Sequence, residues 1–255
     1  MVSRRFAKLS TRDGPRFALL EGGQALELDA PPWASGSPTG VTSSWSHEDL
    51  LCPADPSKII GVGKNYRSHA RELGGQVPAQ PLLFLKPPSA LLDPNGTVVL
   101  PHQSQRVDYE GELGIVIGRR GRRIPLDSAL EHVLGYTIVC DVTARDLQQS
   151  DGQWARAKGF DTFCPVGPWI TQGVDAQSLR LTLKVNGNVR QAGSTADMVF
   201  KIGELISFAS DVMTLEPGDL IATGTPEGIG PLAPGDQVSV EIEQLGQLCF
   251  QVASE

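Results

Sequence analysis

The sequence contains little cysteine, and the cysteines that it has are widely separated. Its four cysteines, in a chain of 255 residues, form no Cys-x-x-Cys pair and no Cys/His group with the spacing of zinc ligands. This pattern excludes the common structural zinc sites and offers no disulfide framework. We therefore expect free thiols, as in a reducing compartment, at Cys52, Cys140, Cys164 and Cys249.

The sequence also lacks long apolar runs and blocks of like charge. No apolar stretch reaches the roughly 18 residues of a membrane span, and the first residues, MVSRRFAKLSTRDG, lack the apolar segment of a signal peptide. The net charge is −7, and the basic residues within 119–123 form only a short cluster, as expected of a solvated turn. These absences predict a cytoplasmic protein that binds neither membranes nor nucleic acids.

The chain divides into two parts of different composition. With 255 residues, 40% of them hydrophobic, it can bury one large core, with or without a small appendage. Near the N-terminus, two short apolar segments flank the turn at 21–23, and the Pro-, Gly- and Ser-rich residues 30–46 that follow are typical of a loop. We interpret residues 1–55 as a small β-rich N-terminal domain and residues 56–255 as the main domain.

Short apolar runs and turn residues dominate the main domain. Strands are predicted for residues 58–63, 81–87, 97–101, 108–118 and 136–141. The segment 179–191 surrounds an Asn-Gly pair and predicts a hairpin. Helical character is limited to the short segments 65–73, 128–135 and 201–215. The sequence therefore predicts an α+β fold that is rich in strands, with short helices and no internal repeat.

Three acidic residues predict a metal site. Glu110 and Glu112 lie two positions apart, so on a strand their side chains point to the same face, where two carboxylates repel each other unless a cation or proton lies between them. Asp141 ends an apolar run, where a carboxylate needs a partner. Three carboxylates suit a hard ion such as Mg²⁺. Alternatively, the two glutamates lie on a solvated strand face. Asp108 belongs either to the cluster or to the surface.

A histidine and a glutamate form a candidate acid–base pair. His69 and Glu72 lie three positions apart in the helical segment 65–73, which places them on one helix face. A carboxylate in this position orients the imidazole and makes it a usable base for activating water. The alternative is an exposed contact without a catalytic role.

Four further polar residues are candidates for substrate contacts. Lys158 stands among small and apolar residues, where it could neutralise a carboxylate or an enolate, or cover apolar surface with its stem. Arg145 and Gln148 follow Asp141 closely and could orient a substrate carboxylate, although Arg145 could equally form a structural ion pair. Thr225 lies in a glycine-rich segment without the Gly-Lys-Ser/Thr ending of a P-loop. It could offer an anion its hydroxyl and nearby backbone N–H groups, or belong to an ordered turn.

Together these segments resemble the fumarylacetoacetate hydrolase family. The resemblance covers about residues 57–253 and rests on seven motifs that occur in order. They are GVGKNYRSHARE, PLLFLKPPSAL, RVDYEGELGIVIGRR, DVTARDLQ, AKGFDTFCPVGPW, VNGNVRQ and LEPGDLIATGTPEGIGPLAPGD. The N-terminal segment resembles the small domain of bacterial members of this length. The resemblance implies a mixed β-roll core with short helices, a homodimer, and a catalytic main domain.

The resemblance also implies a role for each candidate residue. It maps the ligands of a Mg²⁺ or Mn²⁺ ion onto Glu110, Glu112 and Asp141. It maps the water-activating pair onto His69 and Glu72, and the catalytic lysine onto Lys158. Arg145, Gln148 and Thr225 match positions that line the family's substrate pocket. Apart from the resemblance, residues near Trp154 and Phe160 and the N-terminal domain are candidates for the wall around the acyl group of the substrate, which the sequence does not place.

The implied activity concerns small 2-oxo acids and proceeds through an enolate. We expect hydrolysis of the C–C bond in acylpyruvate-type 2,4-dioxo acids, with water activated by His69 and Glu72 and with the enolate stabilised by the metal ion and Lys158. Decarboxylation and tautomerisation give the same enolate. The alternative is therefore a decarboxylase/isomerase or tautomerase of 2-oxo diacids, such as oxaloacetate or intermediates of the homoprotocatechuate pathway. A non-catalytic small-molecule binding protein is a remote alternative.

Overall fold

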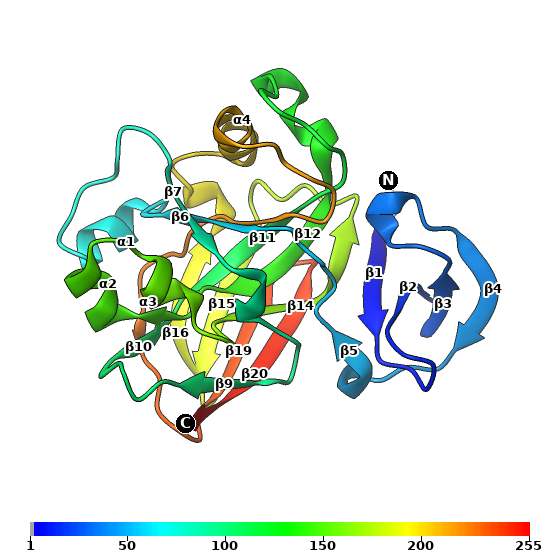
Figure 1. The fold of residues 1–255 in the computed structure, drawn as a ribbon, viewed down its shortest axis with the longest axis horizontal. Helices are drawn as coiled ribbons and strands as arrows, with labels where there is room; N and C mark the ends of the chain where they lie inside the picture. Colours follow the sequence, from blue (N-terminus) through cyan, green and yellow to red (C-terminus); the bar gives the residue numbers. More distant parts are fainter. Residues whose placement is uncertain (1–2) are drawn as a thin grey trace.

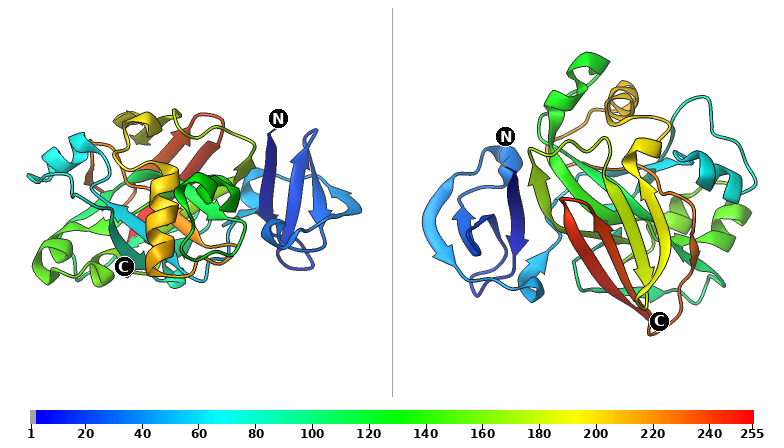
Figure 2. Two further views of the ribbon diagram at one scale, coloured as in Figure 1. Left: turned by 90° about the horizontal axis from the view of Figure 1, so that it is seen from above. Right: turned by 180° about the vertical axis from the view of Figure 1, so that it is seen from behind.

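A sheet of twelve strands runs through both parts of the chain (Figure 1). The computed structural model describes residues 3–255. At the N-terminus the sheet is an antiparallel meander, which stands to one side of the other elements in both figures (Figure 2). The meander consists of β1 (Arg4–Leu9), β2 (Arg16–Glu21), β3 (Gln24–Leu28) and β4 (Pro38–Ser43), with β5 (Leu50–Leu51) paired to β1.

Strand pairing joins this meander to the rest of the molecule. β1 pairs antiparallel with β14 (Cys164–Gln172), and Phe6 lies opposite Ile170. The two side chains also belong to one buried apolar cluster. The first strand of the N-terminal part therefore covers an edge of β14 that would otherwise be open.

One element of the meander differs from the prediction. Residues 38–43, which their composition assigns to a loop, form β4 and pair with β3. All six residues of β4 are exposed, so no alternation of apolar and polar residues marks the strand in the sequence.

Buried strands form the centre of the sheet, as the apolar runs predict. From β14 the sheet continues through β12 (Val133–Cys140), β11 (Gly111–Ile117), β17 (Leu220–Ala222), β6 (Ile59–Gly63) and β7 (Leu82–Lys86). All residues of β11 are buried. β11 and β12 are antiparallel, with Gly111 opposite Cys140, so the start of β11 meets the end of β12. Residues that flank these two ends are therefore neighbours.

A five-stranded sheet packs close to the start of β11. Its order is β16 (Asn188–Ser194), β15 (Arg180–Val185), β19 (Gln237–Ile242), β20 (Gly246–Ser254) and β9 (Thr97–Leu100). A Cβ atom on Gly111 would lie 3.1 Å from Cγ1 of Val240, so the two sheets approach each other closely at this glycine. The predicted hairpin is confirmed: β15 and β16 are joined through Asn186 and Gly187, both with positive φ.

The remaining strands are short. β10 (Val107–Tyr109) lies between β13 (Thr143–Ala144) and β18 (Gly230–Pro231) in a three-stranded sheet. β8 (Leu91–Leu92) pairs in parallel with β14. The four cysteines are free thiols, as predicted.

The helices are short, as predicted, and no helix in residues 3–255 is long and apolar enough to cross a membrane. The α-helices are α1 (Arg67–Glu72), α2 (Arg145–Asp151), α3 (Ala155–Gly159) and α4 (Ile202–Val212). Short 3₁₀ turns occupy Pro32–Ala34, His47–Asp49, Pro88–Ala90, Leu126–His132 and Thr195–Asp197. The helix predicted over 128–135 is wrong beyond residue 132, because pairing with β11 and β14 draws the following residues into β12. The predicted α+β class is confirmed.

Candidate active site

The three acidic residues of the predicted metal site lie together at the junction of β11 and β12. Glu110 and Glu112 flank Gly111, and Asp141 directly follows β12. The backbone N–H of Asp141 donates to the carbonyl of Glu110 at 2.8 Å. Carboxylate oxygens of all three residues lie within 4.8 Å of one another, and all three side chains are buried. The solvated-face alternative is therefore wrong for this pair of glutamates.

Three buried cations oppose two of these carboxylates. Nζ of Lys158 donates to Oε2 of Glu110 at 2.8 Å and to Oδ2 of Asp141 at 2.5 Å. Nζ of Lys86 donates to Oδ1 of Asp141 at 2.7 Å. The guanidinium of Arg145 donates to Oε1 of Glu110. Two lysines and an arginine, which come from β7, α2 and α3, thus converge on the same two carboxylates.

Glu112 has no such cation. Its carboxylate accepts one hydrogen bond, from the backbone N–H of Gly224 at 2.8 Å, and forms no ion pair within residues 3–255. Burial and the neighbouring charges of Asp141 and Glu110 raise the pKa of Glu112 well above its usual value. Burial also acts to raise the pKa of Glu110, but the charges of Lys158 and Arg145 outweigh it and lower that pKa.

These observations fit a hard divalent cation. The donor set consists of carboxylate oxygens alone, which suits Mg²⁺ or Mn²⁺ better than softer metals. The charge of Lys158 acts to lower the pKa of Glu112 but does not outweigh burial and the two acidic neighbours, and a positive ion between the three carboxylates would remove the remaining repulsion. The acidic cluster could therefore bind a metal ion.

The predicted acid–base pair faces the same cluster. Nδ1 of His69, on α1, lies 3.0 Å from Oε2 of Glu72. The other oxygen of Glu72, Oε1, accepts a hydrogen bond from the backbone N–H of Gly228 at 2.9 Å. The side chain of His69 is buried, whereas that of Glu72 is partly exposed. The pair is thus held between α1 and the loop before β18, and is not an exposed helical contact.

One small cavity unites the predicted residues. Its volume is about 20 Å³, and it is lined by the three carboxylates together with His69, Arg145, Gln148, Lys158 and Thr225. Glu72 lies behind His69, outside the lining. Since a volume of this size holds about one water molecule, a substrate can enter only if side chains in the wall shift.

The smaller polar candidates also make defined contacts. Oε1 of Gln148 accepts from Nη1 of Arg145 at 2.6 Å. Oγ1 of Thr225 donates to the carbonyl of Gly111 at 2.9 Å and accepts from Nε2 of Gln191 at 2.7 Å. Gln191 in turn accepts from the N–H of Gly111 at 2.9 Å. Thr225 and Gln191 thereby fix the backbone between the two glutamates.

The sequence does not predict three polar residues of the site, and it leaves a fourth open. The three are Lys64, which lines the cavity, Lys86 and Gln191. A lysine at the end of the apolar run 82–86 and a glutamine in the motif VNGNVRQ are visible signals in the sequence. The sequence allows Asp108 either in the cluster or at the surface. It is buried and accepts from Nε of Arg145 at 2.9 Å and from Nε of Arg106 at 2.9 Å, so it holds Arg145 from behind.

Two aromatic side chains form a wall of the cavity. The rings of Phe84 and Trp154 lie edge to face with their centroids 5.3 Å apart. Glycines make room for them: a Cβ on Gly61 would lie 2.1 Å from the Phe84 ring, and one on Gly63 would lie 2.7 Å from Trp154. Trp154 was a predicted wall residue. Phe160 does not line the cavity and packs instead against Phe163.

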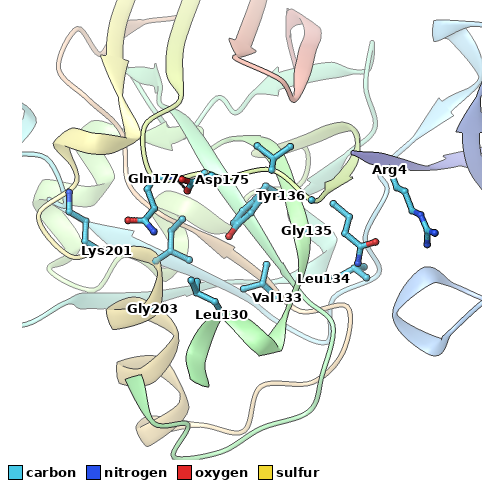
Figure 3. Close-up of a pocket in the computed structure, with 15 residues that line it drawn as sticks. Arg4, Leu130, Val133, Leu134, Gly135, Tyr136, Asp175, Gln177, Lys201 and Gly203 are labelled. Carbon is cyan, nitrogen blue, oxygen red and sulfur yellow. Dashed lines mark hydrogen bonds between the residues drawn. The ribbon is translucent and has the colours of Figure 1, made fainter. Parts of the chain in front are cut away.

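A much larger cavity lies elsewhere (Figure 3). Its volume is about 870 Å³, and it is formed by β12, the loop after β14 and the start of α4, with Tyr136 and Asp175 in its lining and Arg4 at one side. It contains neither a carboxylate cluster nor a histidine among its lining residues. The acidic cluster and the histidine line the small cavity, which is therefore the candidate active site.

Comparison with known proteins identifies the family of both parts of the chain. Residues 58–253 match the family described as fumarylacetoacetate (FAA) hydrolase, C-terminal, and residues 4–53 match the Rv2993c-like N-terminal family. The chain belongs to the fumarylacetoacetate hydrolase family and is an enzyme of that family. This membership is evidence against the non-catalytic alternative.

Two relatives illustrate the sequence similarity. Protein Rv2993c of Mycobacterium tuberculosis is 48% identical over 254 residues, which cover 96% of each chain. The mitochondrial oxaloacetate tautomerase FAHD1 of Arabidopsis thaliana is 44% identical over 202 residues, which cover 77% of this chain and 91% of the relative.

Two solved structures have similar folds. The 2-hydroxyhepta-2,4-diene-1,7-dioate isomerase of Mycobacterium marinum has a TM-score of 0.90 at 44% identity, and the match covers 99% of both chains. The fumarylpyruvate hydrolase of Pseudomonas aeruginosa, solved in complex with Mn²⁺ and pyruvate, has a TM-score of 0.74 at 34% identity, with 82% of this chain and 93% of that chain covered. The similar proteins thus include a tautomerase, an isomerase and a hydrolase.

Proposed function

We propose that the protein is a metal-dependent hydrolase that cleaves the C–C bond of acylpyruvate-type 2,4-dioxo acids. The observation that carries this proposal is the His69–Glu72 pair, which faces the buried carboxylate cluster across one cavity. Tautomerisation and decarboxylation need no water, whereas hydrolysis needs a base that activates one. A buried histidine oriented by a carboxylate is suited to that task.

Glu110, Glu112 and Asp141 would hold a Mg²⁺ or Mn²⁺ ion. When bound, the ion supplies Lewis acid polarisation of the 2-oxo group. The complex of the P. aeruginosa fumarylpyruvate hydrolase with Mn²⁺ and pyruvate supports an ion of this kind in the family.

His69 and Glu72 perform the proton transfer. Glu72 accepts the Nδ1 proton of His69, which leaves Nε2 of the ring as the basic nitrogen. Nε2 removes a proton from water, and the water oxygen attacks the distal carbonyl carbon of the substrate. The bond between that carbon and the pyruvate methylene then breaks, and its electron pair passes to the pyruvate part as an enolate. The proton that Nε2 removed from water is returned to the enolate carbon, which gives pyruvate and the carboxylic acid and restores the neutral imidazole.

Cationic side chains bind the charge that develops. An ammonium has three protons, and Lys158 uses two of them on Glu110 and Asp141, so the third remains for an anionic oxygen. Arg145, held by Asp108 and Gln148, would orient the substrate carboxylate. Thr225 would shape the same wall of the cavity, because its hydroxyl already donates to the carbonyl of Gly111.

The test is a spectrophotometric assay of the protein loaded with Mg²⁺ or Mn²⁺ against a panel of acylpyruvates. The wild type should consume them, and His69→Asn should lower kcat by about 10²- to 10⁴-fold. If the loaded wild type hydrolyses no member of the panel, the proposal is wrong.

The relatives favour a second candidate, the tautomerisation or decarboxylation of 2-oxo diacids. The A. thaliana relative is an oxaloacetate tautomerase, and the M. marinum neighbour is an isomerase of a seven-carbon diacid. Both reactions pass through an enolate that the same cations would stabilise. A His69→Asn variant that loses hydrolysis and keeps decarboxylation of oxaloacetate would support hydrolysis as the role of the pair. Retained hydrolysis would argue against it.

We also propose a homodimer in a reducing compartment. Light scattering coupled to size exclusion tests the first part, because a dimer of a 27.3 kDa chain has about twice that mass. A mass equal to that of the single chain would contradict the proposal.

A further inference from the structure

One cation in the wall of the catalytic cavity lacks an acidic partner. Lys86, Arg145 and Lys158 all form ion pairs with Asp141, Asp108 or Glu110. Lys64 lines the same cavity, yet no carboxylate within residues 3–255 lies within 4.0 Å of its ammonium. Its positive charge is therefore available to a ligand.

The backbone of Lys64 gives a second, independent reason to look at this residue. Its φ is 57°, in the left-handed region that a lysine adopts only at a cost in free energy, whereas glycine adopts it readily and asparagine with less strain. The residue directly follows Gly63 at the end of β6 and precedes α1. A strained conformation at a residue with a long charged side chain points to a function of that side chain.

The ammonium of Lys64 lies on the α1 side of the cavity. A Cβ atom on Gly75 would lie 3.1 Å from Nζ of Lys64, so the ammonium packs against Gly75, shortly after the end of α1. Lys86 and Lys158 instead contact Asp141 at the carboxylate cluster. The cavity thus has cations at two places, of which only the one beside α1 is unpaired.

The proposed reaction fixes which end of the substrate reaches this place. His69, on α1, activates the water that attacks the distal carbonyl, so that carbonyl must lie close to α1. The pyruvate end lies at the carboxylate cluster, near Arg145 and Lys158. The part of the acyl chain beyond the distal carbonyl is then next to α1 and within the surroundings of Lys64.

We propose that Lys64 binds an anionic group at the far end of the acyl chain, so that the preferred substrate is a 2,4-dioxo acid that ends in a second carboxylate. This assignment rests on the proposed function for the orientation of the substrate. An ammonium that no acid neutralises favours a dianion over a monoanion of the same length, since only the dianion places a charge beside it.

The test compares two unreactive ligands that differ only at the far end. 2-Oxoglutarate and 2-oxopentanoate have the same chain, which ends in a carboxylate in the first and in a methyl group in the second. Calorimetry on the full-length protein saturated with Mg²⁺ should show about 10- to 100-fold tighter binding of 2-oxoglutarate by the wild type. In Lys64→Met the ratio of the two affinities should fall to about one, while the affinity for 2-oxopentanoate stays the same.

Arg67→Met is the matched control. Arg67 is three residues away on α1, also forms no ion pair within residues 3–255, and lines a neighbouring cavity but not the catalytic one. It should keep the wild-type ratio, and Lys64→Arg should keep most of it. If Lys64→Met and Arg67→Met reduce the ratio of the two affinities equally, the positive charge around α1 as a whole is responsible, and the assignment to Lys64 is overturned.

The other outcomes are also decisive. If Lys64→Met weakens the binding of both ligands equally, Lys64 has a structural role. If the ratio of the two affinities is unchanged, Lys64 has no role in binding. Either outcome overturns the proposal. If Lys64→Met does not fold, the test is made on the wild type alone. Its preference for 2-oxoglutarate over 2-oxopentanoate must then fall as the ionic strength rises. A preference that does not change with salt overturns the proposal. These binding measurements need no turnover, so they are independent of the proposed hydrolysis. If the wild type hydrolyses no acylpyruvate but Lys64→Met still loses the preference for 2-oxoglutarate, the proposed hydrolysis is refuted and the assignment of Lys64 stands.

Discussion

The backbone of Asp141 is hydrogen-bonded to the carbonyl of Glu110 at 2.8 Å, and this bond holds together the two strand ends that carry the acidic cluster. Glu110 and Glu112 share a face because the side chains of a strand alternate. Asp141 joins them because β11 and β12 pair with Gly111 opposite Cys140. The position of the cluster is thus set by the register of one strand pair.

Removing the charge of Glu112 should abolish stabilisation by Mg²⁺. Mg²⁺ at about 100 times its Kd adds about 2.7 kcal/mol to the free energy of unfolding. For a chain of this size this raises the Tm by about 5 to 10 °C. Glu112→Gln should reduce that shift to below about 2 °C, without lowering the Tm of the metal-free protein, because Glu112 has no cation to lose. The control Glu216→Gln alters a surface partner of Arg120 and should keep the full shift. A full shift in Glu112→Gln would exclude it as a ligand.

Asp108 should matter for substrate binding through Arg145. Asp108→Asn removes the carboxylate that accepts from Nε of Arg145, and the guanidinium should lose its fixed orientation. We expect kcat/KM to fall about 10- to 100-fold, or about 1.4 to 2.7 kcal/mol, mainly through KM. Arg106→Gln is the control, since Arg106 binds the same carboxylate from a half-exposed position and such pairs contribute about 0 to 1 kcal/mol. Equal effects of the two variants would contradict this role.

The sequence predicts the site residues that are placed by local spacing, and it does not predict those that are placed by tertiary contacts. The spacing of Glu110 and Glu112, and of His69 and Glu72, is local, so the period of a strand or helix places them on one face. The contact of Lys86 with Asp141 joins residues 55 positions apart through the arrangement of β7 and β12. No local pattern encodes that contact, and a lysine after an apolar run reads equally well as a surface residue.

The fold shows the same division. The hairpin at Asn186 and Gly187 is predicted because both residues favour positive φ. β4 is not predicted, because its six exposed residues carry no apolar pattern and its strand character comes only from pairing with β3. The pairing of β1 with β14, which joins the N-terminal part to the main sheet, is likewise a tertiary contact.

That pairing predicts the behaviour of a shortened chain. Without residues 1–55, the edge of β14 and the apolar side chains that Phe6 covers would be open to other molecules. Open edges of this kind promote association. We expect chain 56–255 to aggregate in light-scattering measurements at concentrations where the full chain is monodisperse. Val41→Thr, a change on the outer strand β4, should have no effect. A monodisperse, folded shortened chain would contradict the prediction.

Gly61 should be needed to seat Phe84 in the wall of the cavity. In Gly61→Ala the new Cβ would lie 2.1 Å from the ring, so the ring must move and the free energy of unfolding should fall by about 1 to 3 kcal/mol. Denaturation in urea measures this loss, and the added change Phe84→Leu should recover part of it. Gly203→Ala is the control, because the nearest atom to its Cβ would be the end of the Leu126 side chain at 3.3 Å. Equal losses in both alanine variants would show that Phe84 is not the cause.

Lys86 should stabilise the protein chiefly when no metal ion is present. It is buried and donates to Oδ1 of Asp141 at 2.7 Å, so Lys86→Met removes one of the two cations that balance this buried carboxylate. Breaking a buried pair in this way costs about 3 to 5 kcal/mol. An ion held by Asp141 would replace part of the lost charge, so the loss in Tm should be smaller with Mg²⁺ than with a chelator. Lys58→Met is the matched control: Lys58 pairs with the buried Asp219, which is not part of the acidic cluster, and its loss should be the same in both conditions. If Mg²⁺ leaves the Lys86→Met loss unchanged, Asp141 does not share its charge with the ion.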